Sequence, residues 1–509
     1  MAGGSGLLAA CTSSAKSTGP APRSATPGSA TPKHGGNLVL GLTGGSSSDT
    51  IDPHKGVTYL DSSRLQALYD SLVQLDAQAQ IEYALAESIT PNNGLTTEWI
   101  IRLRPGVTFH SGKDLVADDV LYSFRRIISG NLSGTIALGP IDLTATKALD
   151  KLTVLVSMKK PFAGFVEHLA AFWFYLYIAP AGFNVAKPDG TGPFAYQSFN
   201  PGARSVFTRN PHYWKNGLPY ADSLTLIDFS DGVSLQNALI SGAVHGAGTL
   251  DGPQITALAA AGGVRTVVSR AGSITPFTMR VDQTPFSDVN VRQAFRLLVD
   301  RQQLINSASG GYGTVANDIF SPFDPDFDHA LQRQKDIPQA KFLLKKAGQE
   351  NMTVQLVTSA IAAGTIAMAT VLAQQAAAAG VRINLSQVPP GTFFGPSYLR
   401  WTFAQDYYNY SPYLPQVAFS MLPTSPFNET HTSNPRYSSL YEQANATLNA
   451  ATRAQIVHEM QEFDFTQGGY IIPAYIDSLD AYSDKLSGYT TAKVGQPLSN
   501  FGFERFWLA

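Results

Sequence analysis

Cysteine is almost absent from this chain, which has one cysteine in 509 residues. A single thiol cannot form an internal disulfide framework, and it cannot supply a metal site built from several cysteines. Burial of apolar side chains must therefore hold the fold together. Because a single hydrophobic core stops growing at about 250 to 300 residues, a chain of this length should form more than one lobe.

An excess of charge of either sign is also lacking. The 36 basic and 38 acidic residues leave a formal net charge of -2, and the lysines and arginines are scattered along the chain. No basic stripe is available to neutralise a phosphate backbone, so we expect no nucleic-acid partner. None of the nine histidines has the HExxH spacing of a zinc site. We therefore predict structural roles for His110 and His245, and we expect no metal and no other cofactor.

Long hydrophobic runs are missing as well. The best candidate is "LAAFWFYLYIA" from Leu169 to Ala179, and Pro180 and Gly182 follow it. A membrane-spanning helix needs about 20 apolar residues, so this run is too short. We interpret it as buried core of a globular chain.

Two catalytic signatures fail or are absent. The stretch "LRPGVTFHSGKDLVADDVLYSFRRI" resembles a phosphate loop, but five residues separate Gly106 from Gly112, and Lys113 is followed by Asp114. A Walker A loop needs four residues between its glycines and Ser or Thr after its lysine. The chain also lacks a GxSxG nucleophile elbow. We expect a protein that is not an enzyme, although motifs alone leave a two-carboxylate glycosidase open.

The N-terminal segment carries a different signal. "LLAAC", from Leu7 to Cys11, resembles the lipobox of bacterial lipoproteins, of the actinobacterial type, in which the cysteine becomes lipidated. A free thiol in a disordered terminus is the alternative. Only ten residues precede Cys11 and none is Lys or Arg, so we expect the natural start to lie upstream. Residues 12–36 are rich in Ser, Thr, Pro, Ala and Gly, which is typical of a flexible tether.

Helix and strand patterns beyond the tether are those of an α/β protein. Apolar residues recur at helical spacing from Ala117 to Ile128, with two acids in the first turn, and "TEWIIRLRPGVTF" before them predicts two strand-like runs. "VRQAFRLLVDRQQLI", from Val291 to Ile305, predicts a helix with Asp288 as its N-cap. The Ala-rich helix that ends at Gly380 is followed at once by the alternating strand "VRINLSQV", whose Val381, Ile383 and Leu385 share one face.

Several segments resemble one family. "ALAESITPNNGLTTEWIIRLRPGVTFHSGKDLVADDVLYSFRRI", from Ala84 to Ile127, is similar to the signature region of the extracellular solute-binding proteins of family 5, the dipeptide- and oligopeptide-binding components of ABC importers. Further similar segments follow in the family's order. They are Leu60–Asp76, Gly190–Phe194, Arg209–Ile227, Phe286–Ile305 and Ala340–Gly348.

The resemblance implies an α/β, two-lobed periplasmic-binding-protein fold of type II (cluster C), with an extra domain inserted in the first lobe. Residues 1–34 would be a lipobox remnant and tether. The expected division of the body is lobe 1 at 35–76, 190–271 and 479–509, the inserted domain at 77–189, and lobe 2 at 272–478.

The resemblance also places a ligand site in "WTFAQDYYNYSPYLP", Trp401 to Pro415. Asp406 falls where peptide-binding relatives pair an aspartate with the ligand's α-amino group, and Phe403 falls on the aromatic three residues earlier. A buried carboxylate of this kind needs a cationic partner. The alternative is that Asp406 only caps a turn. We expect Trp401, Tyr407 and Tyr408 to contribute to the same site.

The same segment departs from the family pattern. Asn409, Tyr410 and Ser411 stand where an acidic-Pro-acidic run is common, and the tyrosine-rich sequence could either flank a ligand or pack against the hinge. Gly45 and Ser46 would lie along the cleft. "VQLVTSAIAAG" has no arginine to bind a ligand carboxylate, which favours a longer ligand.

These features predict a monomeric capture protein outside the cytoplasmic membrane, lipid-anchored at Cys11, that delivers peptides to ABC permease subunits by hinge closure. One alternative keeps the scaffold and changes the solute to an oligosaccharide, haem or a metal complex. A second alternative is a secreted hydrolase, which turnover of a bound ligand would reveal.

Overall fold

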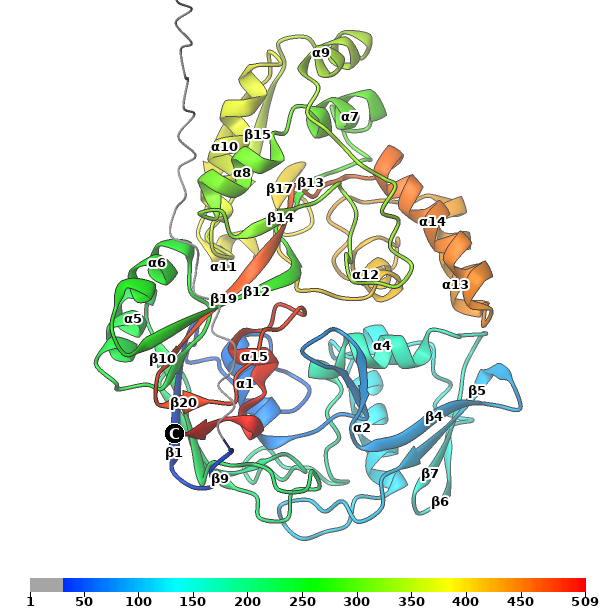
Figure 1. Cartoon of the computed structure of the whole chain (residues 1–509). Helices are drawn as coiled ribbons and strands as arrows, with labels where there is room; N and C mark the ends of the chain where they lie inside the picture. The colour runs from blue at the N-terminus through cyan, green and yellow to red at the C-terminus, as the bar shows by residue number, and fades with distance from the viewer. Residues whose placement is uncertain (1–30) are drawn as a thin grey trace, which may run out of the picture.

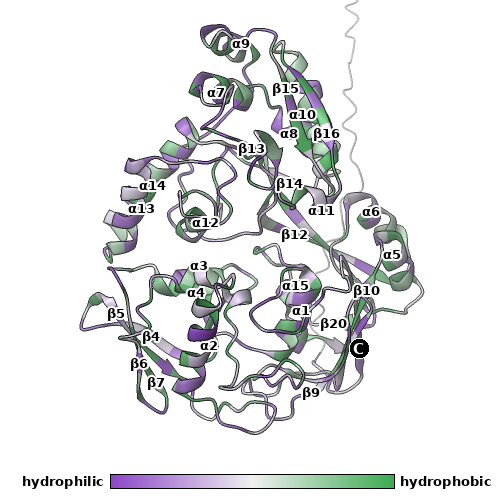
Figure 2. Ribbon diagram, turned by 180° about the vertical axis from the view of Figure 1, so that it is seen from behind, coloured by the Kyte–Doolittle hydropathy of each residue, from purple (hydrophilic) through white to green (hydrophobic). Residues whose placement is uncertain are grey.

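Two lobes joined by a pair of long strands make up the computed structural model, which describes residues 31–509. The connecting strands are β12 (Val264–Ile274) and β19 (Ala474–Ser483), which pair antiparallel. Both cross from one lobe to the other, and Figures 1 and 2 show the same arrangement from opposite sides. Cys11 and the expected lipobox lie outside the described residues.

The first lobe is built on an eight-stranded sheet in the order β12-β19-β11-β1-β10-β9-β8, with β14 also paired to β19. β1 pairs parallel with β10 and β11, and its Leu38, Leu40 and Leu42 are fully buried because alternate side chains of a strand point to the same face. The remaining strands are β8 (Phe194–Asn200), β9 (Arg204–Arg209), β10 (Ser223–Phe229), β11 (Gly246–Ala247), β14 (Gly313–Val315) and β1 itself (Asn37–Thr43).

Short helices and hairpins complete this lobe. They are α1 (Tyr59–Leu68), α5 (Gly232–Ile240), α6 (Gly252–Ala260), α15 (Pro497–Phe501), η2 (Phe503–Arg505), β2 (Val73–Leu75), β3 (Ile81–Tyr83), β20 (Leu486–Ser487) and β21 (Trp507–Leu508). Thr58 and Asp61 form a capping box at the start of α1.

A four-stranded sheet beside the first lobe has the order β4-β5-β7-β6 (Figure 1). Its strands are β4 (Ala86–Asn92), β5 (Leu95–Leu103), β6 (Lys147–Asp150) and β7 (Thr153–Ser157), and its helices are α2 (Ala117–Ser129), α3 (Thr135–Leu138) and α4 (Phe165–Ala171). The predicted helix α2 is confirmed, with Asp118 and Asp119 in its first turn. The prediction of two strands around Pro105 was wrong for the second run, where only Thr108 forms an isolated bridge, to Asp114.

The predicted core run from Leu169 to Ala179 lies in α4, in η1 (Trp173–Tyr175) and just beyond. Most of its side chains are buried, so its interpretation as core is confirmed. Within residues 31–509, no helix has both the length and the apolar character that a membrane crossing requires.

The second lobe combines a three-stranded sheet, β17-β13-β18, with the parallel pair β15-β16. Its strands are β13 (Phe277–Met279), β15 (Thr353–Thr358), β16 (Arg382–Gln387), β17 (Phe403–Gln405) and β18 (Tyr470–Ile471). Its helices are α7 (Val289–Leu297), α8 (Arg301–Ala308), α9 (Ile337–Lys346), α10 (Thr365–Ala377), α11 (Pro390–Phe393), α12 (Tyr413–Ser420), α13 (Pro435–Ala446) and α14 (Ala450–Gln467).

Three sequence predictions fall in this lobe. The single helix expected from Val291 to Ile305 is instead two helices, α7 and α8, because Asp300 caps a second helix just as Asp288 caps the first. α10 and β16 follow one another as predicted, around Gly380 with its positive φ. Leu385, expected on the buried face of β16, is 39% exposed.

A buried arginine holds the first lobe together at the carboxyl ends of β1 and β10. Arg64 in α1 is fully buried and pairs with Asp49 at 2.9 Å, Asp61 at 3.4 Å and Asp228 at 2.6 Å. Its Nε also donates to the Ser205 hydroxyl at 2.8 Å. Burial raises the pKa of Asp228 to about 6, and a hydrogen bond with Asp49 adds to the rise. One guanidinium therefore neutralises part of a crowded acidic group.

Replacing Arg64 with methionine should destabilise the protein. The substitution keeps most of the side-chain volume but leaves buried carboxyl groups without their cation, which typically costs about 3 to 5 kcal/mol. Urea unfolding at neutral pH would measure the loss. The control is Arg125→Met, which changes an exposed arginine of α2. A loss below about 1 kcal/mol, the range of an exposed ion pair, would contradict this account of the cluster.

Candidate functional site

The segment after β17 runs from the second lobe along the connecting strands. Asp406 N–H donates to the Pro276 carbonyl at 3.1 Å, and Tyr408 exchanges two backbone hydrogen bonds with Ile274 at the end of β12. Tyr410 N–H then donates to the Val494 carbonyl of the first lobe at 3.0 Å. The backbone that carries Asp406 is therefore fixed at the junction of the two lobes.

Asp406 lies buried, with 3% of its surface exposed. Its Oδ1 accepts the Tyr407 N–H at 2.7 Å, and its Oδ2 accepts the Tyr398 hydroxyl at 2.6 Å. One oxygen therefore binds the next backbone amide, and no turn begins at Asp406. The other oxygen belongs to a side-chain cluster.

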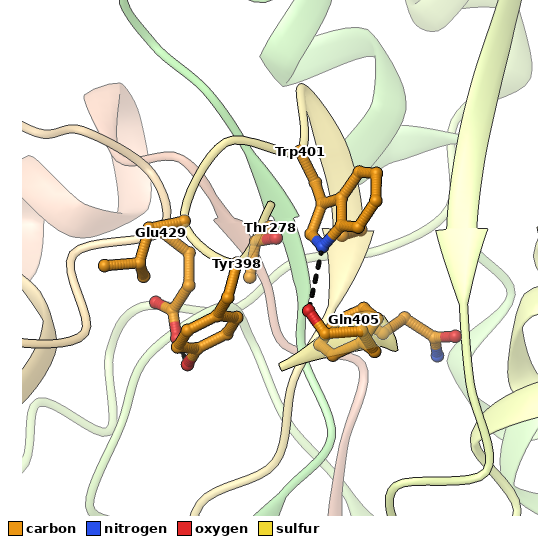
Figure 3. Close-up of a pocket in the computed structure, with 8 residues that line it drawn as sticks. Thr278, Tyr398, Trp401, Gln405 and Glu429 are labelled. Atoms are coloured by element: carbon orange, nitrogen blue, oxygen red, sulfur yellow. Dashed lines mark hydrogen bonds between the residues drawn. The ribbon is translucent and has the colours of Figure 1, made fainter. Parts of the chain in front are cut away.

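Glu429 is the second carboxyl group of that cluster. Its Oε1 lies 3.2 Å from the same Tyr398 hydroxyl, and the Tyr408 and Tyr470 hydroxyls donate to its two oxygens. Figure 3 shows Tyr398 and Glu429 directed toward one another. We call Asp406, Glu429, Tyr398, Tyr408 and Tyr470 the carboxyl cluster.

Burial raises the pKa of both carboxyl groups of the cluster. For Asp406, hydrogen bonds with Glu429 and Tyr398 oppose the rise. The pKa of Glu429 lies well above its usual range, and the Asp406 charge adds to the rise. A charge on one of the two groups therefore disfavours ionisation of the other. Among residues 31–509 neither forms an ion pair, so no protein cation balances a negative charge on the carboxyl cluster.

A small cavity of about 10 Å³ adjoins the cluster, which is room for about one water molecule. Its lining comprises Thr278, Phe393, Tyr398, Leu399, Trp401, Ala404, Gln405 and Glu429. Trp401 stacks on Phe393 and donates its indole N–H to the Phe393 carbonyl at 3.3 Å (Figure 3). Gln405 accepts from Thr358 at 2.7 Å, whereas its Nε2 has no partner among residues 31–509. The cavity wall therefore still offers one donor.

Phe403 lies in the hydrophobic core, contrary to the expectation that it contacts a ligand. It is 1% exposed, and its ring centroid is 5.0 to 6.3 Å from those of Phe286, Phe295 and Phe277. These contacts hold β17 in place. Phe403 thus fixes the strand from which Asp406 projects.

Tyr407 is half-buried and lies between the lobes. Burial raises the pKa of Tyr175 in η1 to about 12, and Tyr407 contributes to the rise. The pKa of Tyr59 in α1 is raised in the same way, and the Tyr59 hydroxyl donates to Asn409 Oδ1 at 2.7 Å. The Tyr59–Asn409 hydrogen bond therefore links α1 of the first lobe to the segment after β17.

Tyr410 and Tyr413, the two later tyrosines of the segment, pack inside the protein. Tyr410 is buried against Phe323, and the Tyr413 hydroxyl donates to the buried Asp464 at 2.5 Å.

Gly45 and Ser46 lie at the end of β1, next to the Arg64 cluster. A Cβ on Gly45 would come within 2.4 Å of Asp228, and Ser46 N–H donates to Asp49 at 2.9 Å. Both residues therefore lie against this cluster.

Sequence reasoning missed Glu429, Tyr398 and Tyr470. Glu429 stands in the irregular loop "SPFNETHTSNP", and no spacing relates it to Asp406, 23 residues earlier. The two tyrosines lie in other segments. Only the folded chain brings the three side chains together.

Both histidines singled out in the sequence bind backbone groups. His245 Nδ1 accepts from Val39 N–H at 3.1 Å, and His110 Nε2 lies 3.0 Å from the Gly192 carbonyl. In residues 31–509, no group of three or more His, Cys, Asp or Glu side chains is arranged to hold a metal ion.

Side chains of α4 and the preceding loop bridge to α13 and α14 of the second lobe. Glu167 pairs with Arg453, Lys160 pairs with Glu442 at 2.5 Å, and His168 Nε2 lies 3.2 Å from the Tyr441 hydroxyl. Burial raises the pKa of Glu167 to about 7, although Arg453 opposes the rise. The lobes are therefore in contact on both sides of the junction.

The two-lobed fold agrees with the family resemblance seen in the sequence. The chain belongs to a family described as bacterial extracellular solute-binding proteins, family 5, whose middle region matches residues 80–439. The fold is that of the two-lobed periplasmic solute-binding proteins.

Three relatives illustrate the similarity. The glutathione-binding protein GsiB of Pectobacterium atrosepticum is 26% identical over 489 residues, which cover 90% of this chain and 92% of the relative. The periplasmic binding protein DppA of Helicobacter pylori, in complex with the peptide STSA, has a TM-score of 0.80 at 20% identity, with 94% and 98% covered. The agropinic acid complex of AgaA from A. tumefacien R10 has a TM-score of 0.81 at 22% identity, with 93% and 99% covered.

The raised pKa values of Asp406 and Glu429 predict a pH dependence of stability. Asp and Glu titrate near pH 3.9 and 4.3 when unfolded. The stabilising contribution of the protonated groups is therefore complete below about pH 4 and is lost as the pH rises toward the folded values. Glu429→Gln removes one titrating carboxyl group, so its stability should gain on the wild type by up to about 1.4 kcal/mol per pH unit as the pH rises from about 5 toward those values.

Chemical unfolding across this pH range measures the difference. The control is Glu462→Gln, which changes an exposed glutamate of α14. Parallel stability curves for Glu429→Gln and the wild type would show that the carboxyl cluster holds no extra proton.

Proposed function

We propose that this protein is the solute-binding component of an ABC importer and that it captures ligands with a free amino group, peptides foremost. One observation carries the proposal. Two carboxyl groups, Asp406 and Glu429, lie buried at the junction of the lobes, and no basic side chain of residues 31–509 pairs with either of them. A ligand ammonium would supply the missing cation.

The charge balance supports this reading. An unpaired buried carboxylate costs several kcal/mol, and natural proteins pair such groups or protonate them. A ligand ammonium would lower the cost of ionising Asp406 and would pair with the resulting carboxylate. A charge-assisted hydrogen bond in a site closed from water is also stronger than one at the surface.

The two-lobed architecture supports capture by closure. β12 and β19 connect the lobes, while Glu167–Arg453 and Lys160–Glu442 bridge them away from these strands. A ligand bound at the junction would favour this closed arrangement, which the permease would recognise. The protein would act as a monomer outside the cytoplasmic membrane and would bind its ligand without turnover.

The names of the relatives support the solute class. One is named for glutathione, and another was solved with a tetrapeptide. The agropinic acid complex shows that relatives with this fold also bind other solutes. For this chain, the three tyrosines at the junction, Tyr59, Tyr175 and Tyr407, would flank a non-peptide ligand as readily as a peptide side chain.

We also propose the domain division expected from the sequence. The first lobe would comprise residues 35–76, 190–271 and 479–509, with the insertion at 77–189 and the second lobe at 272–478. Most of the sheets support it, because β1 and β8 to β11 fall in the first-lobe ranges and β4 to β7 fall in the insertion. Two strands cross these boundaries: β3, in the insertion range, pairs with β2, and β14, in the second-lobe range, pairs with β19.

Asp406→Asn should weaken binding of a free-amine peptide by about 100-fold or more, because the ligand ammonium loses its charged partner. The N-acetylated form of the same peptide should bind the wild type as weakly. Isothermal titration with a set of tetrapeptides measures both. Asp118→Asn, at an exposed aspartate of α2, is the control. Equal affinity of free and acetylated peptides would remove the proposed role of Asp406.

Lipidation of Cys11 is the proposed route to the membrane, and it rests on the lipobox-like "LLAAC". In the native host, Cys11→Ser should move the protein from the membrane fraction to the soluble fraction. Mass spectrometry of the N-terminal peptide should show a diacylglyceryl adduct on the wild type. Thr12→Ser is the control. An unmodified thiol in the membrane-fraction protein would contradict the anchor.

A further inference from the structure

Tyr398 reaches the carboxyl cluster from a segment of turns between α11 and β17. This segment also contributes to the wall of the small cavity beside the cluster. The Tyr398 hydroxyl donates to Asp406 Oδ2 at 2.6 Å and lies 3.2 Å from Glu429 Oε1. One phenol thus contacts carboxyl groups from two other segments of the chain.

The two contacts of the Tyr398 hydroxyl are not equivalent. A phenol has one hydrogen to donate, and Asp406 is the nearer acceptor. Glu429 has other donors, because the Tyr408 and Tyr470 hydroxyls donate to its two oxygens. The Tyr398 hydrogen therefore belongs to Asp406.

Both oxygens of Asp406 are then fixed by donors. Oδ1 accepts the Tyr407 N–H at 2.7 Å, so the backbone holds one side of the carboxyl group. The Tyr398 hydroxyl holds the other side. Without this hydroxyl the carboxyl group could rotate about its terminal bond, and its charged form would lose a hydrogen bond that favours it.

The turn that carries Tyr398 is itself held in place. The Tyr398 ring packs against the rings of Phe394 and Phe427, with centroid distances of 5.1 and 6.3 Å. His431 Nε2 lies 2.7 Å from the Leu399 carbonyl. Leu399 has a φ of 64°, a conformation that a leucine adopts only where its surroundings impose it. The surroundings therefore fix the position of the Tyr398 hydroxyl.

We propose that Tyr398 is a positioning residue for ligand capture, whose hydroxyl holds the Asp406 carboxylate in the orientation that receives the free amino group of the ligand. This inference rests on the proposed function. A carboxylate that is already fixed loses no orientational freedom when the ammonium binds, so more of the interaction is retained as affinity. Tyr398 acts through Asp406 and needs no contact with the ligand.

Tyr398→Phe tests this role, because it removes the hydroxyl and keeps the ring. Isothermal titration measures the affinities of free and N-acetylated tetra-alanine for the wild type and the variant. Affinity for the free peptide should fall by about tenfold, the size of one lost hydrogen bond to a charged group, while affinity for the acetylated peptide stays within about threefold. A purely structural side chain would weaken both peptides alike. An unchanged or larger preference for the free amine would overturn the inference.

Tyr437→Phe is the matched control. The buried Tyr437 also donates its hydroxyl to a buried carboxylate, that of Asp464, at 3.2 Å. Because this pair lies outside the carboxyl cluster, the variant should keep the wild-type preference for the free amine.

Combining Tyr398→Phe with Asp406→Asn gives an independent test. Since Tyr398 acts through Asp406, the added change should weaken binding of free tetra-alanine by less than about threefold beyond Asp406→Asn alone. A larger further loss would show that Tyr398 affects the ligand by another route, which would overturn the inference.

The outcomes separate this inference from the proposed function. If the wild type binds free and acetylated tetra-alanine equally, or binds neither, the proposed function fails and this inference fails with it. If the wild type prefers the free amine and Tyr398→Phe keeps that preference, the proposed function stands and the role of Tyr398 is wrong. A circular dichroism melt of each variant confirms that it is folded.

Discussion

The cost of burying an unpaired negative charge is the constraint on which this site depends. Asp406 and Glu429 lie together away from water, and three tyrosine hydroxyls satisfy their oxygens without neutralising them. Phenols can hydrogen-bond a carboxylate but cannot cancel its charge. The hydrogen bonds lower the cost of burying these carboxyl groups. A cationic group of a ligand would lower that cost further.

The Arg64 cluster shows how the same chain treats buried acids that only hold the fold together. There, Asp49, Asp61 and Asp228 surround an internal guanidinium, so the cation is part of the protein. At the carboxyl cluster the cation is left out. The two clusters use similar side chains and differ in the source of the positive charge. In the Arg64 cluster the protein supplies it, whereas in the proposed binding site the ligand would supply it.

Local signals in the sequence predicted the elements well and the site only in part. The helix at Ala117–Ser129 and the α10–β16 unit follow from periodicity and capping, which are local properties. The break between α7 and α8 was missed because the apolar spacing continues across Asp300, although that residue caps a new helix. Asp406 was singled out by resemblance, and its role in binding stays a prediction. Glu429, Tyr398 and Tyr470 join it in one cluster only through tertiary contacts that no spacing encodes.

The ladder between β12 and β19 is interrupted between Ser269 and Ser273, where the longer stretch of β12 faces a shorter stretch of β19. A bulge of this kind leaves residues without ladder partners and lets the strand twist locally. The hydrogen bonds on either side can therefore persist while the angle between the lobes changes at this point. The side-chain bridges Glu167–Arg453 and Lys160–Glu442 would oppose such a change, whereas the connecting strands would permit it.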